Sequence, residues 1–189
     1  MSTQTWREWP VFIAYRGYYC YNPQCIKHIE VSLMELRVSR ITDSSQLEKT
    51  TGWMYGWWGE AEGYALDAVR SYMAHSLNTQ RLPQTYGLYL GDELIGMYQF
   101  TYEDLFARPD IYPWLANVYV DAQYRKKGYG DFLLRSVKEN AEANLREREL
   151  FLFTSHIGLY EKYGWQQAGE IDTFLEPHKQ RLYRLELDK

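Results

Sequence analysis

A short glycine-bearing loop is the part of this sequence whose residue types and spacing best suit chemistry. The loop follows an apolar run, precedes a helical pattern, and reads Arg125-x-x-Gly128-x-Gly130 with two lysines inside it. Glycines let a backbone approach an anion, and the unpaired amides at a helix start point toward it. Cationic side chains add to that attraction, so we predict a phosphate site for a diphosphate-bearing cofactor. The residues assigned to this site are Arg125, Lys126, Lys127, Gly128, Tyr129 and Gly130.

The loop pattern by itself has an alternative explanation, because tight strand-to-helix connections also carry glycines, and it matches neither common nucleotide fingerprint. A second segment strengthens the cofactor hypothesis. It reads Tyr160-x-x-x-Gly164-Trp165 and follows a short apolar run at 149–154. Together the two segments resemble the GNAT superfamily of acyl-CoA-dependent N-acyltransferases, whose motifs are Arg/Gln-x-x-Gly-x-Gly/Ala and Tyr-x-x-x-Gly-Phe, with Trp165 in place of the phenylalanine. The resemblance extends over residues 34–187.

The resemblance implies both a fold and a cofactor. The implied fold is of the α/β (α+β) class, a mixed and mainly antiparallel central sheet flanked by helices, with splayed central strands. The implied donor is acetyl-CoA or a related acyl-CoA, whose diphosphate would sit on residues 125–130. Its pantetheine arm would run along the strand at 115–120, in a slot beside the strand at 150–153. This adds Val118, Tyr119 and Val120 to the cofactor-binding residues. The implied reaction is direct attack of an amine on the thioester carbonyl.

Tyr160 is the candidate general acid. A phenol has an ordinary pKa of about 10, so it stays protonated at neutral pH and can protonate a leaving thiolate. The alternative is a tyrosine that only packs on the core. We interpret Tyr163 as such a packing residue, because its spacing to Gly164 does not fit the motif.

The general base is harder to place. Some members of the resembled family carry a carboxylate in the strand before the cofactor loop, but the strand at 114–120 has none. The candidates are Glu103, Asp104 and His156, and the imidazole has a suitable ordinary pKa. The alternatives are a loop histidine without a role and a water chain that removes the proton. Asp104 could also hold a cationic amine or cap the loop backbone.

The first two predicted helices, at 43–58 and 64–77, build the acceptor site in the resembled family. Trp57 and Trp58 are adjacent on a helix and cannot point the same way, so one is expected to line the acceptor site. Carboxylates beside aromatic rings suit a protonated amine. We therefore assign Trp57, Trp58, Glu60 and Glu103 to substrate binding, with an ordinary solvated acidic loop as the alternative.

The composition sets broader limits. The 189 residues are 46% hydrophobic and 24% charged, which is typical of one globular domain with a sizeable core. The net charge of −4 argues against a nucleic-acid partner, which usually requires a basic face. No window is long and apolar enough for a membrane span, and the N-terminus lacks a signal-peptide layout. We therefore expect a cytoplasmic protein without a membrane partner.

The N-terminal segment differs in character from the remainder. Alternation of apolar and charged residues begins at Met34, so we predict an extension at 1–33 and the acetyltransferase domain at 34–189. The extension could act as an interface arm, which leaves a homodimer open. It contains Cys20, Cys25 and His28, which are too few ligands for a structural zinc site, and no metal site is predicted.

From Met34 onward, the hydrophobic pattern predicts strands and helices in the order βααβββαβαββ. A hairpin is expected at 85–101, because two strand patterns flank a short glycine-containing turn. A helix is expected at 131–145, and closing strands at 168–175 and 181–187. This order places a phosphate-facing helix after a central strand, as the family resemblance implies.

These observations favour an N-acetyltransferase that uses acetyl-CoA and acts on a primary amine, with a small molecule favoured as the acceptor. One alternative is acetylation of a protein or peptide at its N-terminus or at a lysine. Another is a non-catalytic domain that binds acyl-CoA as a sensor. Tyr160 and the complete loop pattern favour catalysis, whereas the missing strand carboxylate favours the sensor.

The predicted domain boundary can be tested by shortening the chain. A chain that begins at Met34 should fold and bind acetyl-CoA as tightly as the full chain, because residues 1–33 lie outside the predicted domain. Isothermal titration calorimetry on both chains measures this affinity. Insolubility or lost binding would instead place part of the extension in the fold.

Overall fold

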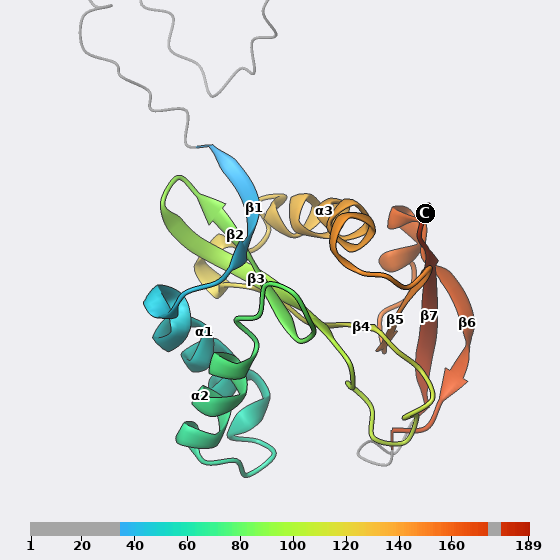
Figure 1. Ribbon diagram of the computed structural model, residues 1–189, viewed down its shortest axis with the longest axis horizontal. Helices are drawn as coiled ribbons and strands as arrows, with labels where there is room; N and C mark the ends of the chain where they lie inside the picture. The colour runs from blue at the N-terminus through green and yellow to red at the C-terminus, as the bar shows by residue number, and fades with distance from the viewer. Residues whose placement is uncertain (1–34, 174–178) are drawn as a thin grey trace, which may run out of the picture. The chain divides into compact units, whose positions relative to one another are not determined.

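The computed structural model describes residues 35–173 and 179–189 (Figure 1). The predicted extension at 1–33, with both cysteines, and the last residues of the strand predicted at 168–175 lie outside the described residues. The strands are β1 (Leu36–Ile41), β2 (Gln84–Leu90), β3 (Glu93–Thr101), β4 (Trp114–Val120), β5 (Glu149–Thr154), β6 (Gln166–Ile171) and β7 (Gln180–Glu186). The α-helices are α1 (Leu47–Met54), α2 (Leu66–His75) and α3 (Tyr129–Asn144), and the shorter helical turns are η2 (Ser44–Gln46), η3 (Tyr55–Gly59), η4 (Ala122–Tyr124) and η5 (Tyr160–Tyr163).

Seven strands of the described part form one sheet in the order β1-β2-β3-β4-β5-β7-β6. All neighbouring strands are antiparallel except β4 and β5, which are parallel. The chain joins β4 to β5 through α3, because parallel neighbours require a crossover connection. The expectation of a mixed, mainly antiparallel sheet flanked by helices is confirmed.

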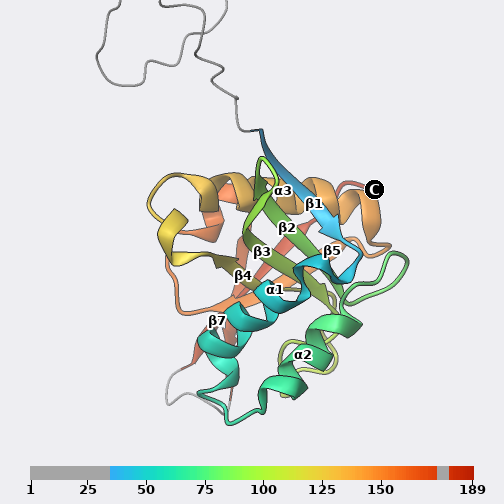
Figure 2. The ribbon, with the colours of Figure 1, turned by 90° about the vertical axis from the view of Figure 1, so that its left-hand side faces the viewer.

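Helices cover both faces of the sheet, with α3 on one face and α1 and α2 on the other (Figures 1 and 2). α3 buries Leu133, Val137 and Ala141, which recur every four residues and so share one side of the helix. They belong to the same apolar cluster as Tyr98 and Phe100 of β3. Successive residues of a strand point to opposite faces of the sheet. The β3 residues that alternate with Tyr98 and Phe100 therefore face α1 and α2.

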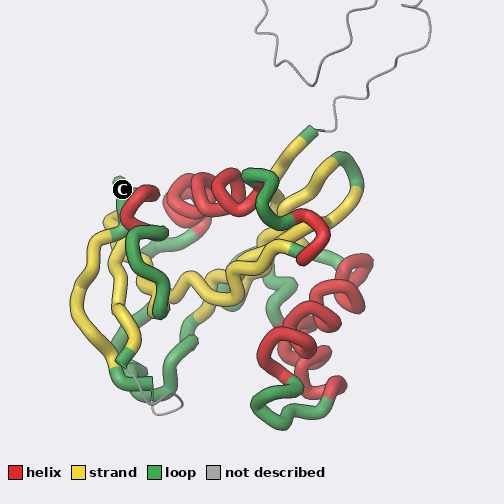
Figure 3. Tube along the Cα trace, turned by 180° about the vertical axis from the view of Figure 1, so that it is seen from behind, coloured by secondary structure: helices red, strands yellow, loops and turns green. Residues whose placement is uncertain are grey.

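The two central strands separate almost as soon as they meet. β4 and β5 pair only at Trp114 and Phe151, where the Phe151 amide donates a 3.0 Å hydrogen bond to the Pro113 carbonyl. Figures 1 and 3 show the β5–β7–β6 strands steeply inclined to β1–β4. The expected splay is therefore confirmed, and the rest of β4 has no pairing partner in β5.

The acceptor-side helices are less regular than the predicted helix at 43–58. Three helical types follow one another there: the 3-10 turn η2, then α1, then the π-helix η3. Close packing of α2 constrains the end of η3, since a Cβ on Gly59 would lie 2.8 Å from the Val69 side chain. A π-turn within a helix often marks a functional site. None of the helices in the described residues is long and apolar enough to cross a membrane.

Candidate functional site

The glycine-bearing loop forms the amino end of α3, as the sequence predicts. Gly128 caps the helix in the left-handed region at φ 87°, which favours glycine. The first hydrogen bond into the helix runs from the Phe132 amide to the Gly128 carbonyl at 3.2 Å. The amides of residues 129–131 precede that bond, so they are free to face an anion. The helix dipole adds a partial positive charge at the same point.

Basic side chains surround this loop and also fasten it to β4. The Arg125 Nε donates a 2.7 Å hydrogen bond to the Val120 carbonyl, and its guanidinium lies 5.2 Å from the centre of the Tyr119 ring. Lys126 and Lys127 are exposed. The loop therefore combines free amides, an unobstructed glycine and positive charge, and these features fit the diphosphate of a nucleotide-like cofactor.

The strand residues assigned to the cofactor, Val118, Tyr119 and Val120, lie beyond the point where β4 leaves β5. Backbone groups on that side of β4 can pair with an extended ligand, since no strand of the sheet covers them. On the other side, β3 approaches very closely. A Cβ on Gly96 would lie 2.7 Å from the Tyr119 carbonyl oxygen, so a larger residue there would displace this part of β4.

Tyr160 lies in η5 with its ring largely buried and no hydrogen bond to its hydroxyl from the described residues. The ring packs edge-on against Trp165 at 6.1 Å, and the Tyr183 ring lies tilted against it at 6.2 Å. Burial, and to a smaller extent the charge of Asp104, together raise the pKa of the Tyr160 phenol to about 12. The phenol therefore stays protonated at neutral pH.

Two hydrogen bonds hold the turn that carries Tyr160. Tyr183 of β7 donates to the Glu161 carboxylate at 2.6 Å, and Tyr163 donates to the Asp131 carboxylate at 2.9 Å. Asp131 lies in the first turn of α3, so the two sequence motifs meet in space. Tyr163 packs on the core as expected and has this additional bond. Gly164 ends the turn in the left-handed region at φ 86°, as predicted.

Asp104 lies in the loop between β3 and β4, and its charge acts on two tyrosines from different elements. Its carboxylate raises the pKa of Tyr160 in η5 and of Tyr72 in α2, which places it near both phenols. Solvent reaches the Asp104 side chain, yet the surrounding protein desolvates the carboxylate and raises its pKa to about 7. Two of the three predicted catalytic residues are therefore electrostatically coupled.

His156 is the third predicted catalytic residue, and it lies in the exposed loop after β5. Its backbone amide donates to the Thr154 hydroxyl at 3.1 Å. Within residues 35–173 and 179–189, no hydrogen bond or ion pair joins its imidazole to Asp104 or Tyr160.

The predicted substrate residues are two tryptophans, each in contact with another aromatic ring, and two exposed glutamates. Trp57 is 50% exposed and its ring lies 5.7 Å from that of Tyr119 on β4. Trp58 is half-buried and meets Tyr72 edge-on at 5.9 Å. The two tryptophans point to different neighbours, as expected for adjacent helical residues. Glu60 and Glu103 are exposed.

Three polar residues at this site were missed by the sequence reasoning: Asn117, Gln99 and Tyr72. Asn117 of β4 accepts from the Trp58 indole at 3.1 Å and donates to the Gln99 side chain at 2.6 Å. A signal was present, because asparagine is depleted in strands and enriched at positive φ. Its position in the apolar strand Trp114–Val120 therefore indicated an irregularity.

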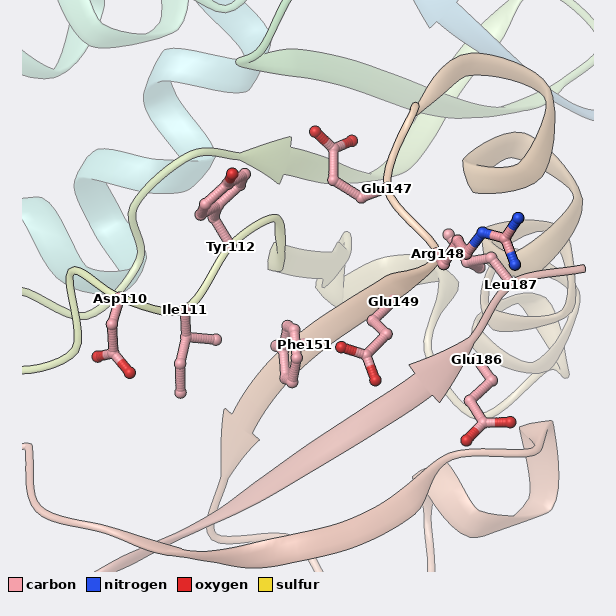
Figure 4. Close-up of a pocket in the computed structure, with 9 residues that line it drawn as sticks. All are labelled: Asp110, Ile111, Tyr112, Glu147, Arg148, Glu149, Phe151, Glu186 and Leu187. Atoms are coloured by element: carbon pink, nitrogen blue, oxygen red, sulfur yellow. The ribbon is translucent and has the colours of Figure 1, made fainter. Parts of the chain in front are cut away.

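A separate cavity lies at the start of β4 and β5, before the two strands diverge (Figure 4). It has a volume of about 750 Å³ and is lined by Asp110, Ile111, Tyr112, Glu147, Arg148, Glu149, Phe151, Glu186 and Leu187. These residues precede β4, begin β5 or end β7, whereas the splay opens beyond the Trp114–Phe151 pair. The cavity therefore belongs neither to the cofactor loop nor to the surroundings of Tyr160.

The sequence pattern of the acetyltransferase (GNAT) domain matches residues 83–167, which include both the Gly128 loop and the Tyr160 turn. The chain contains a GNAT acetyltransferase domain. Acetyl-CoA is the donor that GNAT acetyltransferases use. The free amides at the start of α3 and the positive loop beside them fit its diphosphate. No curated protein matches the sequence.

Solved structures share the GNAT fold. A GNAT acetyltransferase from Streptococcus pneumoniae matches with a TM-score of 0.61 and 16% identity over 82% of this chain and 100% of that chain. The Salmonella typhimurium acetyltransferase that modifies the N-terminal serine of ribosomal protein L7/L12 matches at 0.59 and 12%, over 81% and 95%. A GNAT acetyltransferase from Elizabethkingia anophelis with acetyl-CoA bound matches at 0.55 and 18%, over 80% and 98%. At these identities the similarity shows the fold alone.

Replacing Gly128 with aspartate tests the cofactor loop. Nothing lies within 4 Å of a Cβ at Gly128, so the side chain fits, but its charge should repel the diphosphate and reduce acetyl-CoA binding by at least tenfold. Calorimetry measures the affinity. Gly91→Asp is the matched control, because Gly91 also has a positive φ, of 61°, and open space, in the turn between β2 and β3. Equal affinity of Gly128→Asp and Gly91→Asp would contradict the assignment.

Proposed function

We propose that this GNAT domain transfers the acetyl group of acetyl-CoA to the primary amine of a small cationic molecule, with Asp104 as general base and Tyr160 as general acid. The observation that carries the proposal is the convergence of these two groups from separate loops. Asp104 follows β3 and Tyr160 follows β5, yet the carboxylate is near enough to raise the pKa of the phenol.

Asp104 and Tyr160 suit the two proton transfers of the reaction, from the amine and to the thiolate. Acetyl-CoA supplies an activated acyl carbon and a thiolate leaving group. Asp104 accepts a proton from the ammonium group of the acceptor, so that the amine nitrogen can form the new bond to that carbon. Tyr160 donates its proton to the sulfur as the carbon–sulfur bond breaks. A pKa of about 7 leaves much of Asp104 ionised at neutral pH, and such a base works efficiently there.

The electrostatic coupling also links the two proton transfers. An ionised Asp104 raises the pKa of Tyr160, which makes the phenol a weak donor before the amine arrives. An ordinary thiol has a pKa near 8.5, so proton transfer from a phenol of pKa about 12 to the thiolate is uphill. When Asp104 takes up the amine proton, its charge disappears and the pKa of Tyr160 falls. Proton uptake at Asp104 therefore makes Tyr160 a better acid when the thiolate forms.

Charge on the acceptor side supports a cationic substrate. The segments 50–69 and 82–107, which include η3 and the first half of the loop after β3, contain no lysine, arginine or histidine. Arg108, later in that loop, is paired with Asp110. The same segments carry Glu60, Glu62 and Glu103, all exposed, together with Asp104. Exposed aromatic rings lie beside these acids, and a ring face also attracts an ammonium group. The basic residues of the site belong to the loop at 125–127, where a diphosphate would bind.

A polypeptide amino group is the second candidate acceptor, because the same fold in the Salmonella protein modifies an N-terminal serine. A peptide N-terminus is also a primary amine and would meet the same acidic surface. An acceptor panel of small amines and short peptides separates the two, with released CoA thiol as the readout. Acetyl-CoA binding without thiol release from any acceptor would support a sensor domain instead.

Removal of the carboxylate tests Asp104. Asp104→Asn should lower kcat/KM by ~10²–10⁴-fold, the usual contribution of a general base. In the unmodified protein kcat/KM should rise with pH through about 7 as Asp104 ionises, and this inflection should disappear in the variant. The pKa is higher in the folded than in the unfolded state, so ionisation of Asp104 destabilises the fold. Asp104→Asn should therefore raise Tm at pH 8.

Asp92→Asn is the control for net charge, because Asp92 is exposed in the β2–β3 turn. It should retain both the rate and the inflection. An unchanged pH profile in Asp104→Asn would rule out the carboxylate as the base.

Loss of a single hydroxyl tests Tyr160. Tyr160→Phe should keep the fold and the acetyl-CoA affinity, because the hydroxyl has no hydrogen bond from the described residues. The kcat should fall by ~10²–10⁴-fold if the phenol protonates the thiolate. Tyr163→Phe removes a hydroxyl from the same turn and should cost stability, through its lost bond to Asp131, with little change in kcat. Full activity of Tyr160→Phe, with chemistry rate-limiting, would assign the proton to water.

A further inference from the structure

Asn117 has an unusual backbone conformation at a critical point of β4. Its φ is 52°, in the left-handed region that few residues other than glycine adopt. The pairing of β4 with β3 shifts register between Met97 and Gln99, opposite Asn117, which marks a β-bulge. A bulge bends and twists its strand. Asn117 therefore lies where β4 turns away from the direction of β5.

The side chain of Asn117 makes hydrogen bonds to three other elements. Its Oδ1 accepts from the Trp58 indole at 3.1 Å. Its Nδ2 donates to Gln99 Oε1 at 2.6 Å and to the Tyr72 hydroxyl at 3.3 Å. These partners lie in η3, β3 and α2. One amide thus joins the strand assigned to the cofactor to both helical segments of the acceptor side.

The direction of every bond in this network is determined. An indole N–H can only donate, so the oxygen of Asn117 must face Trp58 and its NH₂ group must face Gln99. Gln99 then presents its own oxygen to Asn117 and its NH₂ group to the Thr85 hydroxyl, at 2.8 Å. Gln99 and Thr85 are fully buried. A buried network in which each donor has an acceptor holds its members in one arrangement.

This arrangement also connects with the proposed acid–base pair. Tyr72 donates to Gln99 Oε1 at 3.2 Å, packs edge-on against Trp58, and lies within the electrostatic reach of Asp104. A displacement of Asn117 would therefore move the surface that an acceptor amine contacts relative to β4. The left-handed backbone at this position does not by itself require asparagine, because glycine could adopt the same φ. The link to the acceptor side therefore comes from the side-chain hydrogen bonds.

We propose that Asn117 is a positioning residue: through its bond to the Trp58 indole, it holds the acceptor-side segment η3 at a set distance from β4 and so aligns the amine with the thioester. The proposal rests on the proposed function, because it assumes that the amine binds beside η3. It predicts a defect in acceptor use that is separate from cofactor binding.

Two variants test the bond. Asn117→Gly keeps the left-handed backbone and removes all three side-chain bonds, and Trp58→Phe keeps an aromatic ring and removes only the N–H. Trp58→Phe should raise the acceptor KM about 3- to 10-fold, as expected for loss of one hydrogen bond, and Asn117→Gly should raise it at least as much. The acetyl-CoA affinity should stay within about twofold, since the loop at 125–130 is unchanged. In the double variant, Trp58→Phe should add no further increase, because its partner is already absent.

Trp53→Phe provides a matched control. The Trp53 indole in α1 also donates a 3.1 Å hydrogen bond, to Asp121 just after β4. The variant loses an equivalent bond to the same strand end but leaves Asn117 intact, so the acceptor KM should not rise. Additive effects of Asn117→Gly and Trp58→Phe, or an equal increase with Trp53→Phe, would overturn the proposal. A parallel loss of acetyl-CoA affinity in Asn117→Gly would also overturn it, by assigning Asn117 to the cofactor slot alone.

A second measurement does not depend on turnover. The indole N–H signal of Trp58 in a ¹H–¹⁵N spectrum can be assigned by its absence in Trp58→Phe. In Asn117→Gly this signal should shift and exchange faster with solvent, because its acceptor is gone. An unmoved signal would refute the bond and with it the positioning role. If no amine in the panel is acetylated, the proposed function fails, and this spectrum still decides whether Asn117 holds η3.

Discussion

The structure depends on one constraint: β4 and β5 are adjacent parallel strands that pair at a single position. Trp114 and Phe151 hold the strands together, and beyond them the two halves of the sheet diverge. A strand inside a sheet normally satisfies its backbone groups with both neighbours, so the remainder of β4 has one free side. That free side leads directly into the loop at the start of α3. The splay therefore supplies an extended binding edge that ends at an anion site.

Several local features maintain the divergence against the tendency of strands to pair. The left-handed Asn117 bulge alters the direction of β4, and Gly96 allows β3 to follow the bent strand closely. Arg125 folds back onto the Val120 carbonyl and joins the loop to the strand end. On the other side, Tyr163 and Asp131 join η5 to α3. The edge of β4, the anion site and the Tyr160 turn are thus parts of one connected framework.

Charge is distributed so that the two reactants would approach different surfaces. The loop at 125–127 is basic, whereas η3 and the residues that follow it to 65 contain only acidic ionisable groups apart from tyrosines. Asp104 is the proposed base that links the two surfaces. Desolvation brings its pKa to about 7, and its charge acts on the phenols of Tyr72 and Tyr160. The same desolvation that makes Asp104 a suitable base destabilises the fold when the carboxylate ionises, which is a common compromise at active sites.

Much of the fold and half of the candidate site could be predicted from the sequence, because they depend on interactions between residues close in the chain. The left-handed Gly128, the helix that follows it, the β2–β3 hairpin and the turn ended by Gly164 all arise from local backbone preferences and periodicity. The position of Tyr160 followed from its spacing to Gly164 in a family motif. The π-helical end of α1 was not foreseen, since packing against α2 rather than local preference shapes it.

The sequence alone leaves Asp104, Glu103 and His156 as candidates for the general base, and the proposal of Asp104 rests on the tertiary structure. These three residues are all chemically capable of accepting a proton, and only their surroundings distinguish them. A pKa depends on which groups lie nearby in space, and the partners of Asp104 are far away along the chain, in α2 and η5. The role of Asn117 likewise requires Trp58, Tyr72 and Gln99, which the fold gathers from three other elements. Local sequence determined the elements and their ends, while the electrostatics and hydrogen bonds of the site arise from contacts that exist only once the sheet has formed.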